Sequence, residues 1–345
     1  MSEIYSPSEI KERFGALPYV TPYSRIIALV DPGGRAVELH EYHARDRCTG
    51  GAAWEVYHYA RTSPLVLSAR REGARNVFVC KTGRAELDLV PGIAGAGLEE
   101  VRVEAGEVLL TYAGLAGGGI AATLCRGMAG NVISTEVHER GGGAELGRAT
   151  LRLPATRRLA IGVDDTDDAE RGATWSLVNE IAFALEAEGE ASYLLHTIAQ
   201  LYPDNPYKTT NCCATAVTLG VPGESLAAVR RAVREELESS TFSDECGMAW
   251  SEEVLVPAPL SRFAERARRG MVTVEEARRV AGEGGAGLEP VTGERGCIGA
   301  LAALGTAEKC PRATTSCSRC GCRPGASAWR PPESRGPAEP GPPTG

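Results

Sequence analysis

The sequence has no long apolar run, and no stretch of its 345 residues approaches the roughly 18 apolar residues that a transmembrane helix needs. Residues 1–6 have neither a basic flank nor an apolar core, so no signal peptide is expected. These two absences predict a cytoplasmic protein without a membrane partner. Its 11 cysteines should then be mostly reduced.

Basic residues are also fewer than acidic ones. The chain carries 37 Lys and Arg against 45 Asp and Glu, which gives a formal net charge of −8. Proteins that bind nucleic acid gather positive charge on one face or stripe. The acidic balance therefore argues against a nucleic-acid partner, although it does not exclude a local basic site.

Residues 1–157 alternate strand patterns with turns, which is typical of an α+β domain. Apolar or alternating runs predict strands at 25–31, 36–42, 76–81, 98–103, 108–112, 132–138 and 144–153. The segment 117–128 begins with three glycines and continues as a predicted helix. Those glycines could cradle an anion or simply form a tight turn. The sequence assigns no role to this domain.

The pattern changes at residue 158. Strands are predicted at 159–163, 191–199 and 214–219, helices at 174–188, 224–238, 262–269 and 274–281, and a short apolar segment at 299–304. This alternation predicts an α/β domain over 158–305, with a ligand site at the carboxyl ends of its strands. Residues 306–345 are rich in Arg, Pro, Gly, Ser and Cys, and we expect them to be a disordered tail. The tail contains Cys310, Cys317, Cys320 and Cys322, whose spacing does not match a two-pair zinc ribbon.

Three carboxylates follow the apolar run 159–163 directly: Asp164, Asp165 and Asp167. Strand alternation would let Asp165 and Asp167 point the same way, while Asp164 faces across or binds at the bend. Carboxylate oxygens at this density suit Mg²⁺, which bridges protein ligands and phosphate oxygens. We therefore predict a metal site at these three residues. The alternative is an acidic turn that caps the next helix.

Two further segments predict contacts to phosphate. Gly172 and Thr174 open the helix that follows the aspartates, where the threonine hydroxyl can cap the helix, contact a bound phosphate, or do both. The segment 205–211 places Lys208 among hydroxyl and amide side chains in a turn between two strands. With Thr209 and Asn211, Lys208 forms a candidate second phosphate clamp, the alternative being an ordinary solvated lysine.

Four motifs occur in a characteristic order: IGVDDTD at 161–167, GAT at 172–174, NPYKT at 205–209 and GERGCIGALAALG at 293–305. This order resembles the archaeal tRNA 2-agmatinylcytidine synthetase family. The resemblance covers roughly residues 158–305 and implies that family's ATP-using kinase-like domain, followed by its ferredoxin-like domain. The whole chain looks closer still to the methanogenesis marker protein 11 family, which pairs this module with an unrelated N-terminal domain.

The resemblance also implies roles for individual residues. Asp164, Asp165 and Asp167 would bind Mg²⁺ and the phosphates of ATP, Thr174 would take part in phosphoryl transfer, and Lys208 would neutralise charge on the transferred group. Two departures weaken the transfer of these roles. Trp175 occupies the place of the family's second threonine, and residues 210–212 replace its Arg-Gly-Asn. The 40 residues after Gly305 are also too few for the family's RNA-binding domains.

The leading hypothesis is an ATP- and Mg²⁺-dependent transferase or ligase, with Thr174 and Lys208 as catalytic residues. It would activate an unidentified acceptor by phosphoryl or nucleotidyl transfer in methanogen metabolism. The acceptor could be a methanogenesis enzyme or a coenzyme precursor. One alternative is a tRNA-modifying enzyme of the agmatinylcytidine synthetase type. The other is a non-catalytic nucleotide-binding scaffold.

Overall fold

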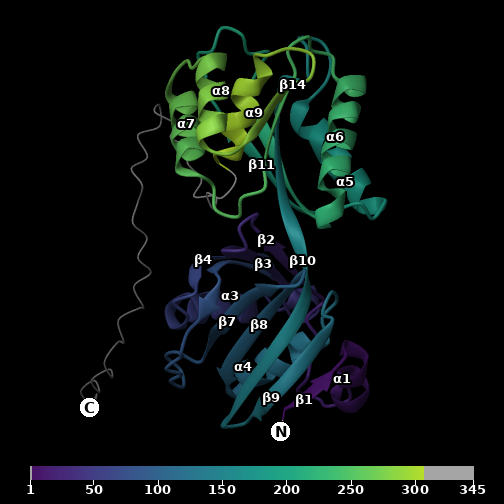
Figure 1. The fold of residues 1–345 in the computed structure, drawn as a ribbon, viewed down its shortest axis with the longest axis vertical. Helices are drawn as coiled ribbons and strands as arrows, with labels where there is room; N and C mark the ends of the chain where they lie inside the picture. Colours follow the sequence, from purple (N-terminus) through teal and green to yellow (C-terminus); the bar gives the residue numbers. More distant parts are fainter. Residues whose placement is uncertain (1, 307–345) are drawn as a thin grey trace, which may run out of the picture. The chain divides into compact units, whose positions relative to one another are not determined.

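A computed structural model describes residues 2–306 of the chain (Figure 1). The expected disordered tail at 306–345 and its four cysteines fall almost wholly outside the described residues. No helix within residues 2–306 is long and apolar enough to cross a membrane.

The longest strand, β10 (Glu145–Asp164), takes part in two sets of strand pairs. Its first half pairs antiparallel with β8 (Glu107–Leu115) and β9 (Ser134–Gly142). Its second half pairs antiparallel with β12 (Cys213–Val221) and β13 (Gly247–Ser251). The two strands predicted at 144–153 and 159–163 are therefore one continuous strand. The expected domain boundary between residues 157 and 158 lies inside it, and the division into domains remains a prediction.

The segment before β10 is built from antiparallel strands and short helices, as the sequence predicted. β2 (Arg25–Val30) forms a hairpin with β3 (Ala36–Tyr42) and also pairs in parallel with residues 155–157 of β10. The other strands here are β1 (Glu3–Tyr5), β4 (Val66–Glu72), β5 (Arg75–Lys81), β6 (Gly83–Arg84) and β7 (Ala96–Glu104). The helices are α1 (Pro7–Phe14), α2 (Ala44–Arg47), α3 (Thr49–Thr62), α4 (Ala116–Ile120) and a π-helical turn at Ala121–Cys125.

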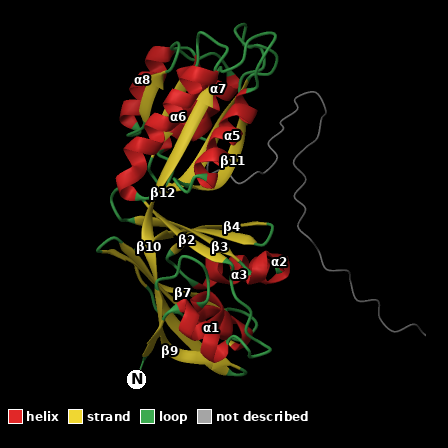
Figure 2. Cartoon of the chain, turned by 90° about the vertical axis from the view of Figure 1, so that its right-hand side faces the viewer, coloured by secondary structure: helices red, strands yellow, loops and turns green. Residues whose placement is uncertain are grey.

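The segment after β10 completes an antiparallel sheet with the order β11-β12-β10-β13-β14. Its further strands are β11 (Ser192–Gln200) and β14 (Gly287–Pro290), and its helices are α5 (Thr174–Ala187), α6 (Leu226–Ser240), α7 (Ala258–Arg269), α8 (Val274–Glu283) and α9 (Gly296–Leu304), with a 3₁₀ turn at Gly223–Ser225. Figure 2 shows strands of this sheet beside the helices of the same segment. The mixed α/β class is confirmed. The strand pairs are antiparallel, however, so the carboxyl end of β10 lies beside the amino ends of β12 and β13.

Alternation along β10 assigns one layer of helices to each face of this sheet. Leu159, Ile161 and Val163 pack with α5 and α6, whereas Ala160 packs with α7, α8 and α9. Gly162 lies on the α9 face, where an added Cβ would come 2.1 Å from the carbonyl oxygen of Ala300. The missing side chain lets α9 lie directly against the strand. Asp164, two residues further on, shares that face.

Candidate functional site

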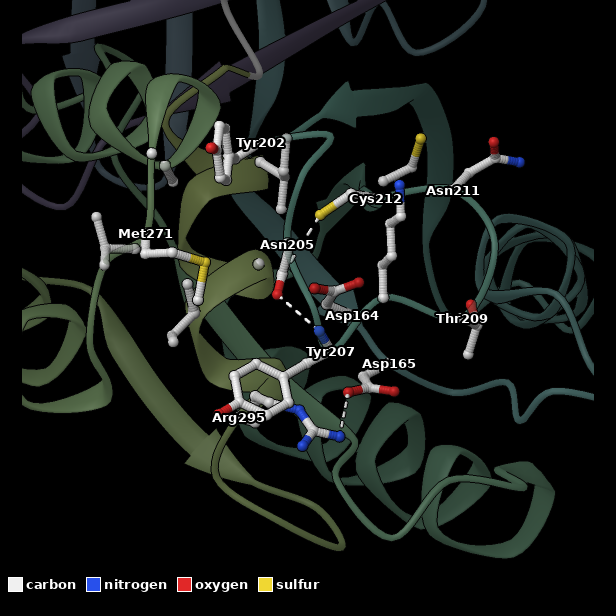
Figure 3. Close-up of a pocket in the computed structure, with 18 of the residues that line it drawn as sticks. Asp164, Asp165, Tyr202, Asn205, Tyr207, Thr209, Asn211, Cys212, Met271 and Arg295 are labelled. Atoms are coloured by element: carbon white, nitrogen blue, oxygen red, sulfur yellow. Dashed lines mark hydrogen bonds and ion pairs between the residues drawn. The ribbon is translucent and has the colours of Figure 1, made fainter.

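A cavity of about 430 Å³ lies at the end of β10 (Figure 3). Its wall comes from four places in the chain: the loop after β10, the loop between β11 and β12, the segment 267–274 that joins α7 to α8, and the beginning of α9. The cavity brings together six of the residues expected from sequence, namely Asp164, Asp165, Asp167, Lys208, Thr209 and Asn211. Gly172 and Thr174 are not among the residues that line it.

Asp164 is the last residue of β10 and lies against α9. An added Cβ on Gly299 would come 1.7 Å from Oδ2 of Asp164, so α9 can approach this carboxylate only because residue 299 is glycine. Burial raises the pKa of Asp164 well above its ordinary value, and the charge of Asp165 raises it further. A cation placed in the cavity would relieve both effects.

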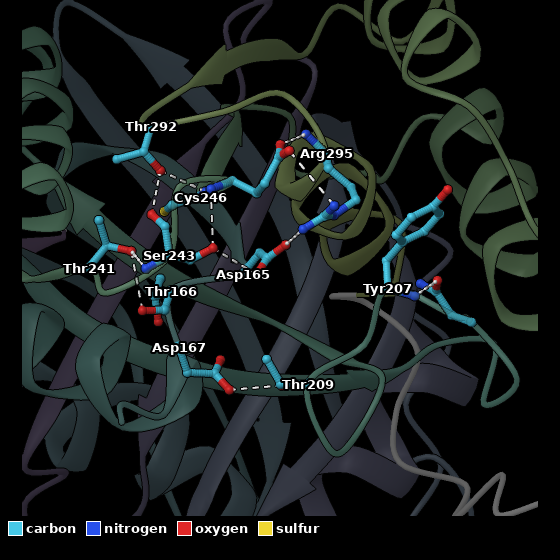
Figure 4. Close-up of polar contacts among 12 residues, drawn as sticks. Asp165, Thr166, Asp167, Tyr207, Thr209, Thr241, Ser243, Cys246, Thr292 and Arg295 are labelled. Atoms are coloured by element: carbon cyan, nitrogen blue, oxygen red, sulfur yellow. Dashed lines mark hydrogen bonds and ion pairs between the residues drawn. The ribbon is translucent and has the colours of Figure 1, made fainter. Parts of the chain in front are cut away.

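Asp165 ends the strand by a change of backbone direction. Its φ of 62° is in the left-handed region, which strand residues do not adopt. The Ser243 hydroxyl donates a 3.0 Å hydrogen bond to Oδ1 of Asp165, and the Arg295 guanidinium lies 3.5 Å from Oδ2 (Figure 4). Burial raises the pKa of Asp165, and these two contacts partly oppose the rise. The turn thus directs the carboxylate of Asp165 toward Arg295. Its direction does not follow the alternation of side chains along β10.

Asp167 is held by two threonines. Thr174 donates a 2.9 Å hydrogen bond to its Oδ1, and Thr209 donates a 3.0 Å hydrogen bond to its Oδ2. Gly172 supports the same loop with a φ of 93°, and an added Cβ there would come within 3.0 Å of Asp167. The loop after β10 is therefore closed on itself and is tied to the loop after β11.

The Thr174 hydroxyl lies inside this closed loop. It accepts hydrogen bonds from the backbone amide and the hydroxyl of Thr166, at 3.2 and 3.0 Å, while it donates to Asp167. Thr174 is the first residue of α5 rather than its N-cap, which is Ala173. With only 7% of its surface exposed, Thr174 here orients Asp167. Its expected part in phosphoryl transfer remains a prediction.

Lys208 and Asn211 line the cavity from the loop between β11 and β12, and Figure 3 labels Asn211 there. Lys208 is exposed, and its ammonium group donates to the carbonyl oxygen of Pro203 in the same loop. The neighbouring Cys212 and Cys213 also line the cavity, and burial raises the pKa of both thiols. A raised pKa favours the protonated thiol, which is a weaker nucleophile than the thiolate.

Arg295 is a site residue that sequence reasoning did not single out. It precedes α9, pairs with Asp165 and with Glu245 at 3.7 Å, and its guanidinium lies 5.1 Å from the ring centroid of Tyr207 (Figure 4). The departure at residues 210–212 suggested that the site lacks a guanidinium. Arg295 places one in the cavity from another part of the chain. The only signal for it was its position in the motif at 293–305.

Comparison with known proteins begins with a relative of almost the same length. The chain is 44% identical over 286 residues to the uncharacterized protein MJ0921 of Methanocaldococcus jannaschii, and the match covers 83% of this chain and 94% of the relative. The chain belongs to the family of this protein. That relative has no described activity, so membership by itself assigns no reaction.

A second group of relatives matches less of the chain. The family model of the TiaS TCKD domain matches residues 160–228. The isoleucine-tRNA 2-agmatinylcytidine synthetase TiaS of Pyrococcus horikoshii is 34% identical over 151 residues, and that of Methanosarcina acetivorans is 31% identical over 153 residues. Each match covers 43% of this chain and 35% of the relative. The chain therefore spans about a third of the length of these synthetases.

The solved structures that resemble the chain include a complex of TiaS with its isoleucine tRNA and ATP. It is 27% identical, has a TM-score of 0.40, and covers 43% of this chain and 36% of that one. The expected resemblance to the agmatinylcytidine synthetases is confirmed by the family model and by the synthetase relatives.

The expectation that disfavoured a nucleic-acid partner is wrong. The relatives that share this module are named for a tRNA substrate. The inference failed because net charge averages over the whole chain. An RNA-binding surface needs only a local concentration of positive charge, which an overall charge of −8 does not rule out.

The fit of Mg²⁺ to this site can be judged from its oxygen donors. Within residues 2–306, no three His, Cys, Asp or Glu side chains converge as a ready metal-binding group. Mg²⁺ does not require such a group, because it is usually held by one or two carboxylates together with waters and substrate phosphates. Asp164 and Asp165 offer carboxylates of raised pKa to one cavity. These donors fit a cation that arrives with a phosphorylated ligand.

Proposed function

We propose that the cavity at the end of β10 binds ATP and that the protein is an ATP-dependent transferase or ligase acting on RNA. The observation that carries the proposal is the joint lining of one cavity by three aspartates, Lys208 and Arg295. This arrangement pairs carboxylates for a metal with cations for phosphate. The aspartates lie in the segment that matches the TiaS TCKD domain, whose named relatives modify a tRNA.

In this proposal each side chain has a defined task. Asp164 and Asp165 would hold Mg²⁺, which when bound neutralises charge on the phosphates, and Asp167 would lie beside them. Lys208 and Arg295 supply positive charge to the transferred group, and Arg295 can donate two parallel hydrogen bonds to one phosphate. Asn211 offers a further donor at the rim of the cavity, and Thr209 holds Asp167 in place. Thr174 and Gly172 keep the Asp167 loop in place.

RNA is the proposed acceptor because the relatives with a named activity use an isoleucine tRNA. The expected place in methanogen metabolism is a second, separate prediction. Its support is that the relative matched over 94% of its length comes from Methanocaldococcus jannaschii. A modified RNA and a role in a methanogen are compatible, so the two predictions do not compete.

The test is a titration of the full chain with ATP and Mg²⁺ by calorimetry, followed by an assay for ATP turnover with and without unmodified archaeal tRNA. We expect ATP binding that requires Mg²⁺, and turnover that tRNA stimulates. Asp165→Asn should weaken binding by about 10-fold or more, because a charge-assisted contact to the metal is lost. Asp204→Asn is the matched control, because Asp204 lies in the loop between β11 and β12 but does not line the cavity.

Several results would contradict the proposal. If wild-type protein does not bind ATP, or if Asp165→Asn binds it as well as Asp204→Asn does, the nucleotide site is wrong. ATP binding without turnover under any condition would favour the non-catalytic scaffold. Turnover that tRNA does not affect would remove RNA as the acceptor and leave the nucleotide site intact.

A further inference from the structure

A second cavity, of about 900 Å³, is lined by residues of the segment before β10 and shares no lining residue with the first. Its lining includes residues of α3, of the beginning of α4 and of the turn between β9 and β10. Eight of its lining residues are glycines: Gly51, Gly92, Gly95, Gly117, Gly118, Gly141, Gly142 and Gly143. Nothing in the proposed ATP chemistry uses this space.

A buried carboxylate forms the floor of the second cavity. Glu55 on α3 lines the cavity with only 2% of its surface exposed. Tyr23 donates a hydrogen bond to its Oε1, and Arg126 lies 3.1 Å from its Oε2. Glu55 therefore has partners on the protein side and is held in a fixed position facing the cavity.

When Glu41 and Glu55 are both ionised, the floor carries one more negative than positive group. The pKa of Glu55 is raised to about 7, so Glu55 is partly protonated near neutral pH, and a cation bound beside it would favour the ionised form. Arg126 is fully buried and lies between two carboxylates, with its Nη2 2.7 Å from Glu41 and 3.1 Å from Glu55. Its guanidinium also faces the rings of Tyr23, Tyr59 and Tyr112, with centroid distances from 4.4 to 5.4 Å. One guanidinium cannot balance two carboxylates, and desolvated charge is costly unless it is paired.

The nearest other candidate cation does not supply the missing charge. The Nε2 atom of His43 lies 3.7 Å from Glu55, but burial and the charge of Arg126 lower the pKa of His43 to about 4. His43 is thus neutral near pH 7. Its Nδ1 atom is buried and has no hydrogen-bond partner within residues 2–306, which leaves a polar group on the cavity wall without its contact.

Aromatic side chains, apolar side chains and the backbone of glycines form the remaining walls of the cavity. Trp54 and Tyr19 line the cavity with 40% and 62% of their surfaces exposed. The Trp54 ring also packs on His58, with 3.9 Å between the ring centroids, so only its other face is open to a ligand. Among the described residues that line the cavity, none is Lys or Arg. A phosphate or another anion would therefore find no counter-charge there, although glycine backbone surrounds it. The first cavity, by contrast, is lined by both Lys208 and Arg295.

We propose that the second cavity binds a small organic cation, with Glu55 as its counter-ion and Trp54 and Tyr19 as aromatic walls. An ammonium or guanidinium group would complete the charge balance at the floor and lie against the rings, which attract cations through their quadrupoles. The apolar part of the ligand would contact Leu115 and Ile120 on the opposite wall. His43 offers one further hydrogen bond. The site is independent of the proposed ATP site.

The test compares three probes of similar shape on the full chain by calorimetry: 2-phenylethylammonium, 2-phenylethanol and 3-phenylpropanoate. We expect the cation to bind about 10-fold more tightly than the alcohol, and the anion to bind weakest. Glu55→Gln should reduce the preference for the cation to within about 3-fold while changing the affinity for the alcohol little. Because Glu55 is buried, Trp54→Leu provides a second variant at an exposed position, and it should lower the affinity for the cation.

A variant that fills part of the second cavity tests whether the probes bind there. Gly117 lines the cavity, and an added Cβ there would meet nothing within 4 Å, so Gly117→Leu fills space without a clash. Gly117→Leu should weaken binding of both the cation and the alcohol. Gly50→Leu is the control, because Gly50 is equally open and lies outside the cavity. The proposal is wrong if no probe binds, if the alcohol or the anion binds as well as the cation, or if Gly117→Leu leaves binding unchanged.

Discussion

The Thr209 hydroxyl donates a 3.0 Å hydrogen bond to Oδ2 of Asp167, and this bond joins two loops that are 42 residues apart in sequence. One loop follows β10 and the other follows β11. Asp167 is thereby fixed from both sides, since Thr174 holds its other oxygen. A carboxylate that is oriented in advance loses less conformational entropy when a metal or a ligand binds.

Removal of this bond should weaken nucleotide binding. Thr209→Val keeps the shape of the side chain but loses the hydroxyl, so Asp167 would be free to rotate. We expect ATP affinity to fall by roughly 3- to 10-fold, the worth of one typical hydrogen bond. Calorimetry measures the change, with Thr210→Val as the control in the same loop because residue 210 does not line the cavity. Equal affinities of the two variants would show that the bond does not orient Asp167.

Thr174 should contribute to stability as well as to function. Thr174→Val would leave the buried amide of Thr166 without an acceptor, so we expect the free energy of unfolding to fall by about 1–3 kcal/mol. Thr174→Ser keeps the hydroxyl and should lose less. Urea denaturation of both variants measures the difference. If Thr174→Val is as stable as wild type but cannot turn over ATP, then Thr174 acts in the chemistry rather than in the loop.

Arg295 should contribute to the binding of the phosphates of ATP and not to the binding of its nucleoside. We expect Arg295→Met to lower ATP affinity by about 10-fold and to leave adenosine binding nearly unchanged, because only the phosphates carry charge that the guanidinium can pair. Arg279→Met is a matched control on the surface of α8, where Arg279 pairs with Glu283. A loss of adenosine binding equal to the loss of ATP binding would place Arg295 elsewhere in the site.

The contact between β10 and α9 should tolerate no added methyl group. Gly162→Ala would put a Cβ 2.1 Å from the carbonyl oxygen of Ala300, so α9 would have to move. We expect the free energy of unfolding to fall by about 2–3 kcal/mol or more. Gly282→Ala in α8, where an added Cβ meets nothing within 4 Å, should be neutral or stabilising by up to about 1 kcal/mol. Thermal unfolding of the two variants side by side would show whether the contact is as close as described.

Glu55 should make stability depend on pH. Burial, with the charge of Glu41, raises the pKa of Glu55 from 4.5 to about 7, although Arg126 opposes the rise. A carboxyl whose pKa is raised in the folded protein contributes stability below about pH 4.5, and that contribution is lost as the pH rises through about 7. Relative to Glu55→Gln, the wild type should therefore lose roughly 1–3 kcal/mol between pH 5 and pH 8.

The groups that face Glu55 are Tyr23, Glu41, His43, Tyr59, Asn76 and Arg126. All of them are retained in Glu55→Gln, so the difference between the two proteins isolates the carboxyl. Urea denaturation at pH 5, 6, 7 and 8 measures it. Parallel stability curves for the two proteins would mean that Glu55 keeps an ordinary pKa.

The sequence predicted local elements well where one face of an element is apolar. The helix at 174–188 and the hairpin at 25–42 follow from such patterns, and both are present. Helix α3 was missed because its buried face carries polar side chains. Ala52, Glu55, His58 and Tyr59 point inward, so no apolar repeat marks the helix.

For the candidate site too, the sequence predicted the residues that are close together in the chain and missed those that only the fold brings together. The three aspartates are adjacent in sequence, so their common position could be predicted. Arg295 could not be placed beside Asp165, because 130 residues separate them and only the packing of α9 brings them together. The buried pair of Arg126 and Glu41, which are 85 residues apart, was equally out of reach. Local patterns do not specify which distant charges meet.

Because β10 forms hydrogen bonds with β8 and β9 in its first half and with β12 and β13 in its second, the sheets on both sides share one backbone. If β10 unfolds, β8 and β9 on one side and β12 and β13 on the other all lose their backbone hydrogen bonds to it. Residues 2–306 should therefore unfold in one cooperative transition, with the same midpoint whether a probe reports on Trp54 or on Trp250.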